Sequence, residues 1–167
     1  MPLAGGTFTG NTIYNDNIKS LFGTGSDLEV YHNGQHSFIK HLQGSGNFFI
    51  ESVANIAFKV ATNESTLNLN SNGSVELFYN NEKTFETLQN GVKILGSEGN
   101  YAYLHLWEDE GDDNADKWRM EVAGGSFKLA NYATGSWVDN LAIDGSGHVG
   151  IGRSSSLQLL DIKGVND

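Results

Sequence analysis

The feature that most constrains this chain is the alternation of apolar and polar residues with a period of two. It recurs at residues 27–32, 65–69, 74–79, 116–122 and 126–130. Successive side chains of a β-strand point to opposite faces, so this alternation predicts strands that each have one apolar face. The runs are five to seven residues long, which is an ordinary strand length.

Turn-forming residues separate these runs. Pairs such as Asn33-Gly34 and Gly124-Gly125 supply the positive φ angles that tight hairpin turns require. The best helical candidate, residues 110–122, is polar in its first half and alternates in its second. We therefore predict an all-β fold of short antiparallel hairpins, with about a dozen strands or more at roughly ten-residue spacing. Further turn signals lie at residues 23–26, 44–46, 72–73, 80–81, 90–91 and 144–147.

Two of the predicted hairpins match each other without a gap. Residues 28–38 (LEVYHNGQHSF) align with residues 75–85 (VELFYNNEKTF), an offset of 75 − 28 = 47. Both segments have a Glu between two apolar residues, an Asn at the turn and a Phe in the return strand, and a weaker echo follows at residues 127–137. Repetition with this period predicts stacked hairpin units, none of which buries its apolar face alone.

Bulky residues are expected on both faces of these hairpins. In the first, Leu28 and Val30 point one way and Tyr31 points the other. Only 38% of the residues are hydrophobic, so a monomer has little reason to place aromatic rings on a second face. Burial against a copy of the same chain explains the pattern, and the sequence therefore predicts a homo-oligomer.

Composition and charge exclude several classes of function. The 20 acidic and 10 basic residues give a net charge of −10, which argues against general nucleic-acid binding. The absence of Cys excludes disulfide scaffolds, thiolate metal sites and cysteine nucleophiles. No apolar run approaches the length of a membrane span, and we expect no classical signal peptide. Neither nucleic acid nor membrane insertion is therefore expected.

Several segments resemble phage tail-fibre sequences. Residues 2–10 (PLAGGTFTG) resemble a module found in tail fibres. Residues 21–34 (LFGTGSDLEVYHNG) are similar to a segment that recurs in structural and tail-fibre proteins of marine phages, including cyanophages. Residues 116–119 with 125–129, and residues 144–152 (DGSGHVGIG), are also similar to fibre segments.

The resemblance implies a phage virion structural protein, most directly a segment of a tail fibre or another exterior appendage. It implies an elongated homotrimer, intertwined or side by side, that contacts neighbouring virion proteins and a glycan or protein of the host surface. A head-attached decoration or fibre protein is the alternative structural role. A stand-alone carbohydrate-binding β module is the alternative of another class, and a glycan depolymerase is a third.

An acidic stretch at residues 108–116 contains six carboxylates and no basic residue. Clustered carboxylate oxygens are ligands that Ca²⁺ prefers, although the spacing does not reproduce the calcium-loop motif. We interpret the stretch first as a solvated loop between a strand that ends at Trp107 and one that begins near Lys117. The alternative is a metal site, whose candidate ligands are Asp109, Asp112, Asp113 and Asp116.

Aromatic residues crowd the second half of the chain. Exposed aromatic rings stack on sugars, and neighbouring polar groups bind hydroxyls, so these residues are candidates for a glycan or receptor site near the acidic stretch. The alternative is that the rings fill the core or an interface between copies. The candidate residues are Tyr101, Tyr103, Trp107, Trp118 and Trp137.

No constellation of residues points to catalysis or to a cofactor. The chain has no Gly-x-Ser-x-Gly elbow and no phosphate-binding loop, and its Gly-Ser-Gly triplets have the pattern of turns. The five His residues are interpreted as structural or surface groups. We expect a structural protein that is not an enzyme, with four segments: residues 1–26 and 145–167 as fibre segments, 27–99 as the two hairpin repeats, and 100–144 as the aromatic and acidic-loop region.

Overall fold

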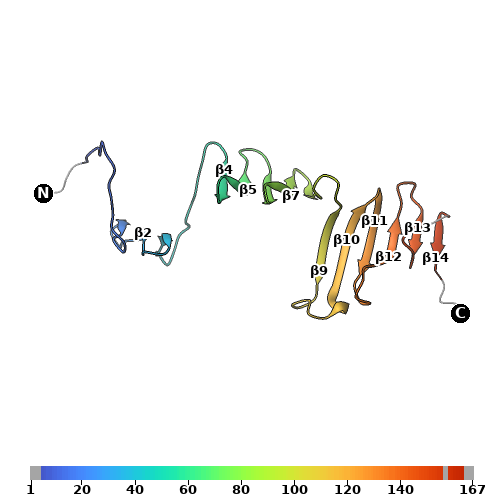
Figure 1. Cartoon of the computed structure of the whole chain (residues 1–167). Coiled ribbons are helices and arrows are strands. Elements are labelled where there is room, and N and C mark those ends of the chain that lie inside the picture. Colours follow the sequence, from blue (N-terminus) through green and yellow to red (C-terminus); the bar gives the residue numbers. More distant parts are fainter. Residues whose placement is uncertain (1–4, 156–157, 164–167) are drawn as a thin grey trace. The chain divides into compact units, whose positions relative to one another are not determined.

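The computed structural model describes residues 5–155 and 158–163, and this part of the chain is all-β (Figure 1). It contains fourteen strands and one short 3-10 turn, η1 (Asn114–Asp116), with no α-helix among the described residues. The predicted all-β class is confirmed. The chain divides into two compact units, Met1–Glu51 and Ser52–Asp167. The outermost parts of the predicted first and last segments lie outside the described residues.

The first unit contains one three-stranded sheet, in the order β1-β2-β3. Val30 lies opposite Ile39, whereas Tyr31 lies opposite Phe38 and stacks on it with ring centroids 4.8 Å apart. Leu28 and Val30 therefore share one face, and Glu29 and Tyr31 share the other. The strands are β1 (Ser20–Phe22), β2 (Leu28–His32) and β3 (Ser37–His41).

The second unit begins with a five-stranded antiparallel sheet whose strands follow in chain order. The register places one apolar residue of each strand in a single row across this second sheet. That row is Phe58, Leu67, Leu77, Phe85 and Ile94. The strands are β4 (Ile56–Val60), β5 (Glu64–Leu69), β6 (Val75–Tyr79), β7 (Glu82–Leu88) and β8 (Gly91–Ile94).

A six-stranded third sheet completes the second unit, and its strands also follow in chain order. Five of the strands pair antiparallel, but β14 runs parallel to β13, with Val149 opposite Leu160. The prediction of antiparallel hairpins alone is therefore incomplete, because β13 and β14 form a parallel pair. The strands are β9 (Ala102–Trp107), β10 (Lys117–Ala123), β11 (Ser126–Asn131), β12 (Val138–Ile143), β13 (Val149–Ile151) and β14 (Leu160–Ile162).

The predicted turn pairs close hairpins in both units. Asn80 and Asn81 have φ angles of 53° and 64°, and Gly124 and Gly125 have 57° and 78°, as two-residue hairpin turns require. The two hairpins that match in sequence differ in register. A bulge between Leu77 and Phe78 sets Phe85 opposite Leu77, whereas Phe38 lies opposite Tyr31. Phe38 therefore shares a face with Glu29 of its hairpin, whereas Phe85 lies on the face opposite Glu76.

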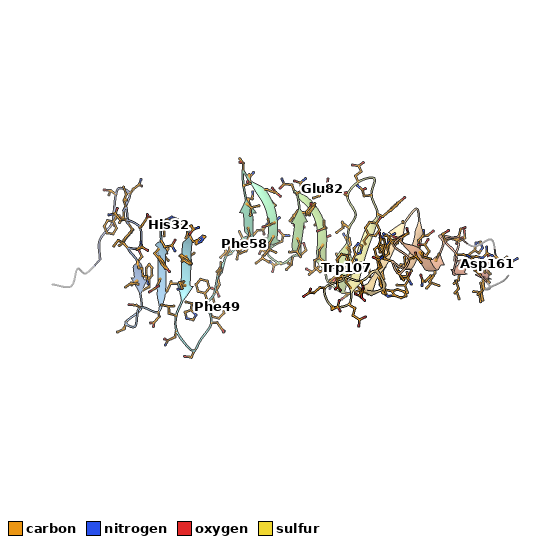
Figure 2. All side chains as sticks on the ribbon, turned by 60° about the horizontal axis from the view of Figure 1, so that its bottom comes forward. His32, Phe49, Phe58, Glu82, Trp107 and Asp161 are labelled. Atoms are coloured by element: carbon orange, nitrogen blue, oxygen red, sulfur yellow. The ribbon has the colours of Figure 1, made fainter. Side chains whose placement is uncertain are left out.

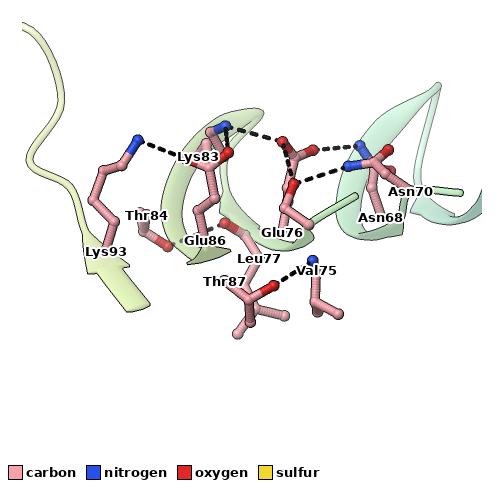
Figure 3. Close-up of polar contacts among 11 residues, drawn as sticks. Asn68, Asn70, Val75, Glu76, Leu77, Lys83, Thr84, Glu86, Thr87 and Lys93 are labelled. Carbon is pink, nitrogen blue, oxygen red and sulfur yellow. Dashed lines mark hydrogen bonds and ion pairs between the residues drawn. The ribbon is translucent and has the colours of Figure 1, made fainter. Parts of the chain in front are cut away.

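The face of the second sheet opposite its apolar row carries a charge network (Figure 3). Lys83 Nζ lies 2.9 Å from carboxylate oxygens of both Glu76 and Glu86, and Lys93 Nζ lies 2.7 Å from Glu86. The hydrogen bonds from Lys93 and then Lys83 lower the pKa of Glu86 from its ordinary 4.5 to about 2. The same contacts with Glu86 and Glu76 raise the pKa of Lys83. Opposite charges in equal number hold this face together.

The described strands form no hydrophobic core in the usual sense. The buried apolar residues are only Ala130 and Ala142 among the described residues, whereas Glu29 and Glu121 are buried acids. Side chains stand on single layers of strands in Figure 2, and many large apolar ones are exposed. The second and third sheets therefore each keep one apolar face that no other described strand of their unit covers, and the first sheet carries large apolar side chains on both faces. The described residues include no helix long and apolar enough to span a membrane.

We predict that Glu86→Gln lowers the melting temperature at pH 7 and flattens its dependence on acid pH. A carboxyl whose pKa is lowered on folding stabilises the fold above its ordinary pKa, and this stabilisation is lost as the pH falls from about 4.5 to about 2. Thermal melts between pH 7 and pH 2 measure both effects. Glu82→Gln, at the turn end of the same strand, is the control, and equal effects of the two variants contradict the prediction.

Candidate functional site

One face of the third sheet gathers aromatic and cationic side chains. Tyr103, His105 and Trp107 alternate along β9, and Arg119 lies opposite His105 while Lys117 lies opposite Trp107. Directly opposed residues share a face, so the strand pairing itself produces this surface. We call it the aromatic face, and its members are Tyr101, Tyr103, His105, Trp107, Lys117, Arg119, Tyr132 and Trp137.

The Trp137 ring lies between His105 and Tyr132 on the aromatic face. Trp137 directly precedes β12, and its ring lies 5.5 Å from His105 and 5.2 Å from Tyr132 between centroids. The Arg119 guanidinium lies 4.3 Å from the Trp137 ring and 4.8 Å from the Tyr103 ring. A guanidinium is planar and weakly hydrated, so it favours such positions over aromatic rings.

The same face continues into a chain of ion pairs across β10, β11 and β12. Arg119 lies 2.6 Å from Glu121, and Lys128 lies 3.8 Å from Glu121 and 2.8 Å from Asp139. The hydrogen bond to Asp139 raises the pKa of Lys128. Glu121 is only 4% exposed, so its charge depends on these two cations for compensation. The aromatic face thus combines stacked rings with a chain of ion pairs.

Of the five predicted glycan residues, Trp118 lies on the opposite face. It pairs with Leu106 of β9, so it stands with the apolar residues of the sheet. Two rows of opposed apolar residues cross all six strands on this side, one containing Met120 and the other Val122. We call this surface the apolar face of the third sheet. The rows are Leu104, Met120, Leu129, Leu141, Ile151 and Ile162, and Ala102, Val122, Phe127, Ile143, Val149 and Leu160.

An open hollow at one end of the third sheet is lined both by predicted aromatic residues and by residues of the acidic stretch. Trp107, Trp118 and Asp116 line it together with His105, Leu106, Glu108 and Leu129. Three of these residues, Leu106, Trp118 and Leu129, belong to the apolar face. The other predicted aromatic residues lie away from this hollow on the aromatic face. Trp107 is 54% exposed, which leaves much of its ring available for stacking.

The acidic stretch forms the loop that joins β9 to β10, between Trp107 and Lys117 as predicted. The loop folds back onto Trp107 through Gly111, which has a φ of 63°. A Cβ atom on Gly111 would come within 2.9 Å of the Trp107 ring, so glycine is needed both for the backbone and for the close approach. The loop therefore helps to fix the position of Trp107.

Three of the four predicted metal ligands come together in this loop. Carboxylate oxygens of Asp109, Asp112 and Asp116 lie within 4.8 Å of one another, and among the described residues this group does not include Asp113. Asp113 instead donates its backbone N–H to Asp116, at 3.3 Å. Burial, followed by the charge of Asp109, raises the pKa of Asp116. Three carboxylates are part of the coordination that Ca²⁺ takes, and metal binding here stays a prediction.

The prediction from sequence missed His105, Arg119 and Tyr132 as members of the aromatic face. His105 is two residues from Tyr103 and two from Trp107, so the alternation along the strand places it on the same face and could have identified it. Arg119 and Tyr132 depend on the register between strands, which the sequence pattern does not specify. Elsewhere, His148 lies 3.0 Å from Asp144 within a turn, and His32 contacts Ser37.

We predict that Arg119→Met destabilises the fold by about 3 kcal/mol, because it leaves the buried Glu121 without its nearest cation. Urea unfolding at one fixed protein concentration measures the loss. The double variant Arg119→Met/Glu121→Leu removes both charges and should lose less than the single variant. Arg119→Lys keeps the charge but not the planar stacking, so an unchanged stability of this variant would contradict a role for the ring contacts.

A scan against protein-family models and a search of curated proteins gave no match to this chain.

Proposed function

We propose that this chain is a structural segment of a phage virion, most directly of a tail fibre, that assembles with copies of itself and meets the host surface. The observation that carries the proposal is the pair of single-layer sheets in the second unit, each with one apolar face that no other described strand of that unit covers. A sheet with an apolar face needs a second layer to cover it. In a fibre, that layer comes from another copy.

Exposed apolar side chains support assembly. Many large apolar side chains of the described strands are exposed, for example Val92 at 61% and Ile39 at 65%. Such a surface favours a subunit over a stand-alone monomer.

The resemblance to tail-fibre segments supports the number of copies and the place on the virion. Residues 21–34, which carry the most specific resemblance, include the last two residues of β1, all of β2 and the first residues of the turn after β2. The family implies a homotrimer, and we adopt three copies for that reason. The alternative structural role is a head-attached decoration or fibre protein, which would also assemble from copies of the chain.

The aromatic face supports contact with the host. Its rings and the acidic loop beside Trp107 combine stacking surfaces with hydrogen-bond acceptors, which is the chemistry that binds sugars. A stand-alone carbohydrate-binding module would use the same face, and it is the second candidate function. The fibre segment and the carbohydrate-binding module differ in their mass in solution, because the module acts as a monomer.

We predict a mass in solution of three times 18.1 kDa, about 54 kDa. Light scattering coupled to size-exclusion chromatography at micromolar concentration measures it. A mass of 18.1 kDa, together with binding to glycans, would favour the carbohydrate-binding module and overturn the fibre proposal.

We further predict that Trp107→Ala weakens binding to host cells or their surface polysaccharide about tenfold, the loss that a central aromatic contact typically causes. A glycan array and cell-binding assays measure the effect. Tyr79→Ala, which removes an exposed ring from the second sheet, is the matched control. Absence of binding by both the wild type and the variants would contradict a role in host contact.

A further inference from the structure

We propose that a second hollow of the third sheet, lined by Trp137, Arg153 and Lys163, binds the anionic group of an acidic sugar, a carboxylate or a sulfate. We call it the cationic hollow. The inference rests on the host contact proposed above and names the class of glycan that the aromatic face takes. Three features carry it: the strand order at this end of the sheet, the unpaired positive charge, and the rings that connect the hollow to Trp107.

The parallel pairing of β13 and β14 places the ends of both strands at the same end of the third sheet. Arg153 follows β13 and Lys163 follows β14, and the Lys163 backbone N–H donates to the Ile151 carbonyl at 3.0 Å. Because β12 runs antiparallel to β13, β12 begins at this end and brings Trp137 there. An antiparallel β14 would have carried Lys163 to the opposite end of the sheet.

The cationic hollow has the size and the polarity that suit a polar group of a ligand. Its volume is about 510 Å³, which lies within the range of ordinary ligand pockets. Ser154 and Ser155 line it beside the two cations. Their hydroxyls donate hydrogen bonds, and a guanidinium and an ammonium bind carboxylate or sulfate oxygens through charge-assisted hydrogen bonds. The lining therefore offers several donors to one anionic group.

The acids near the cationic hollow leave part of its positive charge unpaired. Asp161 lies 3.1 Å from Nε of Arg153 and so engages one nitrogen of that guanidinium. Asp139 also lines the hollow, but it lies 2.8 Å from Lys128. Lys163 is exposed and, in the part of the chain that the structure describes, has no ion-pair partner. Three cations thus stand against two acids, which favours an anionic ligand over a neutral one.

A path of aromatic rings joins the cationic hollow to Trp107. The His105 ring lies 5.9 Å from the Trp107 ring and 5.5 Å from the Trp137 ring between centroids. Trp107 ends β9 and Trp137 precedes β12, three inter-strand spacings away, or roughly 14 Å. A ligand that reaches both is therefore an oligosaccharide, with sugar rings stacked on the aromatic side chains and an acidic group in the hollow.

One feature opposes an acidic ligand, the acidic loop at residues 108–116. The loop lies at the same end of the sheet, but it joins β9 to β10, whereas the cationic hollow lies beyond the start of β12. Salt screens exposed charges over about 10 Å at 0.1 M ionic strength, so the repulsion is weak at the hollow. The two charged regions instead fix the direction of the ligand, with its acidic group directed away from the loop.

Matched polysaccharides test the inference. Polygalacturonate and its methyl ester share the same sugar ring, but only the first carries carboxylates, and dextran sulfate with dextran is the matched pair for sulfate. We expect the full chain to bind the acidic member of at least one pair about tenfold more tightly than the neutral member, in biolayer interferometry at 0.1 M salt. The preference should disappear at 1 M salt, where screening acts within about 3 Å. The pair that shows it distinguishes a carboxylate from a sulfate.

Substitution of Lys163 tests the position of the site. Lys163→Gln should weaken binding of the preferred acidic polymer about tenfold, the loss of one charge-assisted contact, and Lys163→Arg should retain it. Lys59→Gln removes the same charge from an exposed lysine of the second sheet and is the matched control, which should bind as the wild type does. Thermal melts check that all three variants remain folded.

The outcomes separate this inference from the proposed host contact. Equal binding of acidic and neutral polymers, no binding of any acidic polymer, or equal losses in Lys163→Gln and Lys59→Gln overturns the inference. The host contact still stands in those cases if Trp107→Ala weakens binding to host cells. If Lys163→Gln loses the acidic polymer and Trp107→Ala does not, the cationic hollow stands and the proposed contact through Trp107 is overturned.

Discussion

The structure depends on one constraint, the pleat of a strand in a sheet of a single layer. Each residue that faces one side of the sheet places its neighbours in the strand on the other side. No second layer of described strands in the same unit packs on the sheet to bury these side chains. Leu28, Val75 and Met120 therefore each direct an adjacent glutamate to the opposite face. From this follow the exposed apolar rows and the concentration of charge on the opposite face of each sheet.

The three glutamates Glu29, Glu76 and Glu121 occupy corresponding places. Each lies between two apolar residues on an inner strand, and each is paired with a cation: Lys19 at 2.9 Å, Lys83 at 2.9 Å, and Arg119 at 2.6 Å. Long side chains that lie along a sheet cover apolar stems while their charges neutralise one another. A polar face built in this way is stable in water without a second layer, so it suits the outside of the proposed assembly.

The period of two was sufficient to predict the fold class, because alternation depends only on neighbouring residues. It also predicted the loop between Trp107 and Lys117, where the alternation stops. It could not predict registers, which depend on turns and bulges: the bulge beside Leu77 places Phe85 differently from Phe38. For the same reason, the candidate site was predicted as one group of rings, whereas strand pairing separates Trp118 from the aromatic face.

The strands of all three sheets pair in chain order, which has a consequence for how the molecule forms. Neighbouring strands close short loops, so contact order is low and each sheet can form quickly without waiting for distant parts of the chain. In the proposed assembly, association of chains comes later, since it requires an encounter between molecules. Between these two steps the newly formed sheets present long apolar rows and unpaired edges, which is the condition under which β-proteins aggregate. In the proposed assembly pathway, the interval between folding and association is therefore the stage at which aggregation is most favoured.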